Sequence, residues 1–192
     1  MSDADEQSRD LTVDPLDDLT ELGDIGAQAR SEWRAEYDET VGEARMQWEH
    51  GRTLMERVRD LMSRGDQVRI DTAGATFIGV LIDLGTNWCS CATPAGSVDI
   101  QLLNAAGTPL PVVIRRITRE QSGGRRSPHQ PISFRAHLYE LEMNGAPIRV
   151  GSYALADSAT GLLTVSADHM TVDSGEQCAW LPIDVVSWLT VE

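Results

Sequence analysis

The 192-residue chain has a formal net charge of −14, and 41% of its residues are hydrophobic but only 5% aromatic. This hydrophobic content excludes a wholly disordered chain, and the acidic balance opposes long-range attraction to nucleic acid. No apolar run reaches the ~20 residues of a membrane-spanning helix, the start is acidic and polar, unlike a signal peptide, and the three cysteines form no disulfide framework. We therefore expect a soluble, cytoplasmic protein without membrane contact.

The N-terminal third divides into a tail and a helical arm. Residues 1–18 are rich in Asp, Glu, Ser and Gln, and they predict a disordered acidic tail. Residues 19–64 have apolar residues at steps of three and four, which predicts a long helix. Glycines weaken a helix, so we expect a break near Gly23–Gly26 or near Gly51.

One apolar stripe follows this arm. It comprises Leu19, Leu22, Ile25, Ala29, Trp33, Tyr37, Val41, Ala44, Trp48, Met55, Val58 and Met62. The stripe either packs on the chain's own β-structure or pairs with another helix as a coiled coil or bundle. A helix of about 40 residues is about 60 Å long, which is too long for one small core to cover. Trp33, Tyr37, Val41 and Trp48 are therefore the candidate interface of the arm.

From Gly65 the helical period changes to an alternating one. Short runs separated by Gly- and Pro-containing turns predict a small antiparallel barrel over residues 65–117. The expected strands cover 67–71, 76–84, 88–92 and 97–102, with a short closing strand at 112–114. Gly79, in the middle of the longest run, allows the sharp bend that a closed barrel needs.

Residues 118–132 predict an exposed linker, because Gly and Pro punctuate them. Five arginines cluster at and just before this segment: Arg115, Arg116, Arg119, Arg125 and Arg126. Such a cluster can neutralise several phosphates or dock on an acidic protein surface, and it can also be a merely solvated turn. These arginines are candidates for binding nucleic acid or a protein partner.

The last third, residues 133–192, repeats the middle of the chain. The segment from Gly65 to Ile70 aligns with that from Gly145 to Val150, and Gly79 aligns with Gly161. Residues 87–91 then align with residues 168–172, and a closing strand is expected over residues 180–189. A helical stretch at 133–143 precedes this second copy, as the arm precedes the first. Two copies of about 60 residues are each marginal alone, so we expect them to bury a shared face.

The order of a helix, the Gly-x-x-Val-Arg-Ile motif at Gly65, the bent strand with Gly79 and the turn before Asn87-Trp88 resembles the Sm-like barrel. Over roughly residues 30–192 the chain is similar to uncharacterised actinobacterial tandem Sm-like proteins, often labelled "Fis family transcriptional regulator". That resemblance implies an α+β fold with two small Sm-like antiparallel β-barrels after a long N-terminal helix, the second a diverged repeat. It also implies RNA binding through an Asn at the position of Asn87. The later loop, 93–97, lacks the basic residue of that family.

Catalytic and metal-binding motifs are sparse. A zinc site could be formed by Cys89, Cys91 and Cys178 with His169. However, Cys89 and Cys91 are separated by one residue on a strand, which places their thiols poorly for tetrahedral geometry. We interpret the cysteines as small buried hydrophobes. The sequence has no nucleophile elbow, phosphate loop or dinucleotide fingerprint, so we expect no cofactor, no small-molecule substrate and no enzymatic activity.

Two functional hypotheses remain. The first is a non-enzymatic interaction or scaffold protein whose partner is another protein or a second copy of itself, bound through the arm. The alternative is an RNA- or DNA-binding regulator that uses the Arg-rich segment with Asn87 nearby. We interpret Trp88, Trp180 and Trp188 as plugs of the β-structure rather than as base-stacking platforms.

Overall fold

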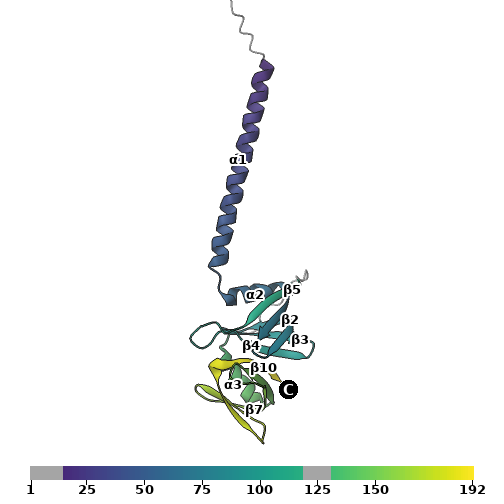
Figure 1. Cartoon of the computed structure of the whole chain (residues 1–192), viewed down its shortest axis with the longest axis vertical. Helices are drawn as coiled ribbons and strands as arrows, with labels where there is room; N and C mark the ends of the chain where they lie inside the picture. Colours follow the sequence, from purple (N-terminus) through teal and green to yellow (C-terminus); the bar gives the residue numbers. More distant parts are fainter. Residues whose placement is uncertain (1–14, 119–130) are drawn as a thin grey trace, which may run out of the picture. The chain divides into compact units, whose positions relative to one another are not determined.

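The computed structural model describes residues 15–118 and 131–192, apart from the side chains of residues 15–26 and 29. The expected tail (1–18) and linker (118–132) lie largely outside this part of the chain. The chain divides into two compact units, residues 1–52 and 53–192, each of which is described by itself. In the first unit, helix α1 spans Pro15–His50. The second unit is mixed α and β (Figure 1).

The break expected near Gly51 is confirmed, whereas α1 runs through Gly23 and Gly26 without interruption. Helix α2, Leu54–Arg64, begins immediately after the break. Thr53 caps it with a reciprocal pair of hydrogen bonds to Glu56: the Thr53 hydroxyl accepts from the Glu56 N–H, and the Glu56 carboxylate accepts from the Thr53 N–H. Gly65, at a φ of 69°, ends it in the left-handed conformation that glycine adopts at low cost.

Ten strands and a third helix make up the rest of the described second unit. The strands of the first half are β1 Gln67–Thr72, β2 Ala75–Leu84, β3 Trp88–Thr93, β4 Gly96–Gln101 and β5 Val113–Thr118. Helix α3, Phe134–Asn144, opens the second half, which continues with β6 Ile148–Ser152, β7 Ala159–Val165, β8 His169–Asp173, β9 Cys178–Pro182 and β10 Val186–Val191.

The strands form one antiparallel sheet that is not closed. Its order is β5-β1-β2-β3-β4-β10-β6-β7-β8-β9. The α+β class is therefore confirmed, but the strands do not divide into the two separate barrels expected from the sequence. The physical reason is strand β10, which hydrogen-bonds to β4 on one side and to β6 on the other, and so joins the halves (Figure 1).

The prediction of one closing strand over residues 180–189 is wrong in one respect. The structure divides this segment into β9, a 3-10 turn at Ile183–Val185, and β10. β9 pairs with β8, whereas β10 crosses to β4 and β6. Pro182 lies at the division, where its lack of an N–H prevents it from continuing a hydrogen-bonded ladder on both sides.

Two hydrophobic cores lie in this unit, one in each half. The core of the first half packs α2 on strands β1–β4, and that of the second half packs α3 on β6–β10. Each core also contains a tryptophan from the other half: Trp188 of β10 belongs to the first core, and Trp88 of β3 belongs to the second. The two halves thus bury a shared face, and neither core is complete without the other half.

Candidate functional site

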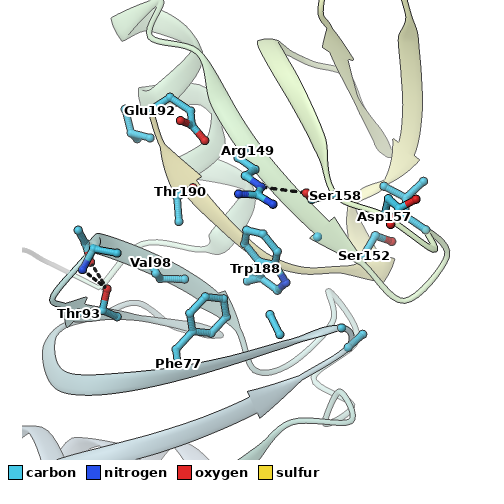
Figure 2. Close-up of a pocket in the computed structure, with 18 of the residues that line it drawn as sticks. Phe77, Thr93, Val98, Arg149, Ser152, Asp157, Ser158, Trp188, Thr190 and Glu192 are labelled. Atoms are coloured by element: carbon cyan, nitrogen blue, oxygen red, sulfur yellow. Dashed lines mark hydrogen bonds between the residues drawn. The ribbon is translucent and has the colours of Figure 1, made fainter.

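A cavity of about 760 Å³ lies where the two halves meet (Figure 2). The first half lines it with the β1–β2 and β3–β4 turns, and the second half lines it with β6, the loop after β6, and β10. The position follows from the pairing of β4 with β10, because this pairing brings the turns of one half against the strands of the other.

Two aromatic rings form one wall of this cavity. Phe77 and Trp188 meet edge to face, with ring centroids 5.3 Å apart and an interplanar angle of 69° (Figure 2). The indole lies so close to Gly151 that a Cβ atom there would be 2.2 Å from Nε1 of Trp188. That indole nitrogen is buried and has no hydrogen-bond partner among the described residues. Gly151 therefore sets the depth to which Trp188 enters the junction.

The charged side chains of this cavity are of both signs. Nε of Arg149 donates a hydrogen bond of 2.8 Å to the Ser158 hydroxyl (Figure 2). Asp157 and Glu192 also line the cavity, so its lining carries one cation and two carboxylates. The described lining contains no His and no Cys, and it offers no pairing of a nucleophile with a base.

Asn87, the candidate RNA-contacting residue, lines a second cavity of about 480 Å³. Its amide is engaged by the backbone at both ends. Nδ2 donates to the Leu103 carbonyl at 3.0 Å, and Oδ1 accepts from the Phe134 N–H at 2.7 Å. The second bond caps the start of α3, so Asn87 ties the first half to the helix of the second. Its side chain has a structural role that the sequence did not reveal.

A third cluster of side chains, formed by His137, Asp99 and Trp88, was not predicted from the sequence. His137 of α3 forms a 2.8 Å hydrogen bond between its Nε2 and Oδ2 of Asp99 in β4. The imidazole also stacks on Trp88, with centroids 4.0 Å apart. Both members of the His–Asp pair are largely buried. The spacing of His137 along the chain does not reveal this pair, because it gives no sign that α3 lies over β4.

The arginine candidates are only partly described. Arg115 and Arg116 are exposed neighbours on the edge strand β5, and Arg119, Arg125 and Arg126 lie outside the described residues. A nitrogen of Arg115 lies 3.5 Å from Oδ2 of Asp71. Hydrogen bonds from Thr76 and Arg69, with the charge of Arg115, lower the pKa of Asp71. The Asp71 carboxylate therefore neutralises part of the positive charge that Arg115 and Arg116 place on this edge.

The arm residues Trp33, Tyr37, Val41 and Trp48 are all exposed, with Trp33 67% accessible. Three of these side chains are aromatic, and each of their rings contacts a neighbour in the same unit. Trp33 stacks on Tyr37 with centroids 5.7 Å apart, and the Arg52 guanidinium lies 4.3 Å from the centroid of Trp48. The arm therefore presents an apolar surface in the described residues.

Cys89 and Cys91 are buried among the apolar side chains of the first core, while Cys178 is exposed on β9. Burial raises the pKa of the Cys91 thiol to about 11, and it also raises the pKa of Cys89. The described residues contain no cluster of three or more His, Cys, Asp or Glu side chains able to hold a metal ion. The two buried thiols thus occupy hydrophobic positions.

Comparison with known proteins adds no assignment. No family model, no curated protein and no solved structure matches the chain. Among the helices in residues 15–118 and 131–192, none combines the length and the apolar character needed to cross a bilayer.

Proposed function

We propose that the chain is a non-enzymatic scaffold protein of the cytoplasm that associates with a second copy of itself through helix α1. The observation that carries this proposal is the exposed apolar stripe of α1, formed by Trp33, Tyr37, Val41 and Trp48. Large apolar side chains gathered on one exposed surface are typical of interaction sites.

The spacing of the stripe fits a helical partner. Trp33 and Ala44 are 11 residues apart, as are Tyr37 and Trp48. Eleven residues correspond to slightly more than three turns, so the stripe runs nearly parallel to the axis of a straight helix. A 36-residue helix is about 54 Å long, and the same stripe on a second copy matches it in length and character.

A non-enzymatic role is supported by the described cavities. The cavity where the two halves meet combines apolar walls with one arginine that is already bound to Ser158. His137 stacks on Trp88, and its hydrogen bond to Asp99 joins the two halves, which is a structural use of both side chains. A scaffold needs surfaces rather than reactive groups.

We also infer that the two halves are Sm-like units, the second a diverged repeat of the first. Each half has a helix ended by glycine, Gly65 or Gly145, followed by five strands in the same relative order. The registers agree as well: Val68 lies opposite Gly79 in one half, and Ile148 lies opposite Gly161 in the other.

The alternative is RNA or DNA binding through the arginines. It is favoured by the adjacent exposed side chains of Arg115 and Arg116 on β5. The engagement of both ends of the Asn87 amide by backbone groups argues against base contacts by that residue. Binding of mixed-sequence RNA should then depend strongly on salt and weaken in Arg115→Ala/Arg116→Ala. Absence of binding at low salt would exclude this alternative.

Sedimentation equilibrium of the full-length protein tests the association of the arm. Trp33→Ser/Tyr37→Ser should weaken self-association at least tenfold without changing the unfolding of the second unit, because both side chains lie on the surface of α1. The matched control is Arg34→Ser/Glu39→Ser, on the same helix, which should leave most of the association intact. Equal weakening in both variants, or a monomeric parent protein at every concentration, would contradict the proposal.

A further inference from the structure

One polar cluster of the first half surrounds a carboxylate. Oδ1 of Asp71 on β1 accepts hydrogen bonds of 2.8 Å from Nε of Arg69 and from the Thr76 hydroxyl. A terminal nitrogen of Arg115 lies 3.5 Å from Oδ2 of the same carboxylate. The hydrogen bonds from Thr76 and Arg69 lower the pKa of Asp71, so this set of donors favours the ionised form.

The second half keeps donors at these places and lacks the carboxylate. The register of β6 with β7 and β10 matches that of β1 with β2 and β5. In this register Arg149 and Thr190 hold the places of the two arginines, and Ser158, directly before β7, holds that of the threonine. Gly151 holds the place of Asp71. The second half therefore has a similar cluster of donors without an acceptor of its own.

These donors are available to a ligand, because they line the cavity of about 760 Å³. Nε of Arg149 is fixed by its 2.8 Å hydrogen bond to the Ser158 hydroxyl, which keeps its own hydrogen to donate. The terminal nitrogens of Arg149 and the Thr190 hydroxyl have no partner in the described part of the chain. The buried N–H of Trp188, beside Gly151, also lacks an acceptor among the described residues. Buried donors without an acceptor are costly, so an acceptor is expected here.

The same cavity also carries negative charge. Asp157 and Glu192 line it with exposed side chains, and neither is paired within the residues that the structure describes. In Figure 2 they lie on opposite sides of Arg149. A simple anion would be attracted by the arginine and repelled by both carboxylates. A ligand that carries one charge of each sign complements the lining better.

The remaining surface suits an apolar group. Phe77 and Trp188 form one wall, on which an aromatic or large aliphatic group can pack (Figure 2). Gly74 and Gly96, in the turns that line the cavity from the first half, have no atom within 4 Å of where a Cβ would be. The cavity is thus open on that side, and its volume lies within the range of about 300–1,000 Å³ typical of small-molecule sites.

We propose that this cavity binds a zwitterionic ligand of the amino-acid class. Arg149, Ser158 and Thr190 hold its carboxylate, which takes the part that an aspartate plays in the first half. Asp157 and Glu192 attract its ammonium group, and its apolar side chain packs on the aromatic wall. Free amino acids and short peptides share this chemistry. The site lies in the second unit, and its occupation does not depend on the association of α1.

Isothermal titration calorimetry of the full-length protein tests the proposal with two probes, L-phenylalanine and L-phenylalanyl-L-phenylalanine. At least one should bind saturably with one molecule per chain, and the tighter of the two identifies the source of the ligand. The N-acetyl and the C-terminal amide forms of that probe should each bind at least about tenfold more weakly, because each lacks one charge. No saturable binding of either probe at up to about 10 mM would overturn the proposal, as would full affinity for either blocked form.

The carboxylate contact is tested by Arg149→Gln, which should weaken binding of the tighter probe at least about tenfold. The matched control is Arg69→Gln, the same change at the equivalent place of the first half and outside the cavity. It should leave the affinity within about twofold of the parent. Both side chains are exposed, and urea unfolding verifies that each variant is folded. An equal loss of affinity in the two variants would overturn the assignment of the site.

The ammonium contact is tested by Asp157→Asn/Glu192→Gln. This variant should weaken binding of the zwitterionic probe and leave that of its N-acetyl form unchanged, since the acetylated probe has no positive charge to lose. The four affinities form a double-mutant cycle between protein and ligand, in which independent contributions add. Equal weakening for both probes would show that the carboxylates do not face the ammonium group and would overturn that part of the proposal.

Discussion

Trp88 and Trp188 show how differently the two halves of the sheet use the same kind of side chain. Each tryptophan is buried in the core of the opposite half. Nε1 of Trp88 donates a 3.1 Å hydrogen bond to the Ile132 carbonyl, just before α3, whereas Nε1 of Trp188 is buried against Gly151 with no partner in the part of the chain that the structure describes. Trp88 thus fixes a chain segment as well as filling space, and Trp188 is held by packing alone. Two halves with the same strand order can therefore be held together by different interactions, a hydrogen bond with packing at Trp88 and packing at Trp188.

Truncation of either tryptophan is expected to have the largest effect on stability. Trp88→Ala and Trp188→Ala should each lower the free energy of unfolding by about 3–5 kcal/mol, because each opens a cavity in a core. The phenylalanine variants sharpen the comparison. Trp88→Phe should cost about 1 kcal/mol more than Trp188→Phe, since only Trp88 gives up a hydrogen bond. Urea unfolding of the full-length proteins measures both differences, and a larger loss for Trp188→Phe would contradict this account.

Gly79 and Gly161 should respond alike, because they hold the same place in the two halves. A Cβ atom at Gly79 would lie 2.0 Å from the Ala92 carbonyl oxygen, and one at Gly161 would lie 2.3 Å from that of Asp173. Backbone must shift to admit it, so each alanine variant should lose about 1–3 kcal/mol. Gly42→Ala, at an open position of α1, is the control and should leave the unfolding of the second unit unchanged. If only one of the two strand variants is destabilised, the equivalence of the halves fails at this position.

Substitution of Cys91 is expected to have the smallest effect on stability, because the buried Val172 holds the same position in the second half. Cys91→Val should change stability by less than about 1.5 kcal/mol near neutral pH. Burial raises the pKa of this thiol to about 11, so the stability of the parent is complete below the ordinary thiol pKa and is lost as pH rises toward 11. The variant should lose less stability over that interval, which urea unfolding at a series of pH values measures.

Thiol labelling measures the same burial directly. A disulfide reagent should modify one cysteine, the exposed Cys178, in the native protein and all three after unfolding. Rapid labelling of two or more thiols in the native state would show that the hydrophobic interpretation of Cys89 and Cys91 is wrong.

Much of the local structure could be predicted from the sequence, because it depends on neighbours along the chain. The change of period at Gly65 located the first strands, and the glycine at position 51 located the break between α1 and α2. The route of the last strand could not be predicted. The expected single strand over residues 180–189 ignored Pro182, and no local pattern shows that β10 reaches across to β4.

The candidate site was predicted less well than the fold. The exposed stripe of α1 follows from spacing, and the structure places Trp33 and its neighbours on the surface. The His137–Asp99 pair and the hydrogen bond of Asn87 to α3 join residues that are 38 and 47 positions apart in sequence. Such contacts arise from the packing of α3 over the first half, which periodicity within either segment does not report.

The central place of β10 also governs the order in which the molecule can be completed. As the chain leaves the ribosome, the first half emerges more than sixty residues before Trp188, which belongs to its core. Until then the β4 edge is unpaired, and an unpaired edge in a nascent chain favours aggregation. Contacts between segments so distant in sequence also form slowly. The core of the first half therefore cannot be completed until the second half has been synthesised.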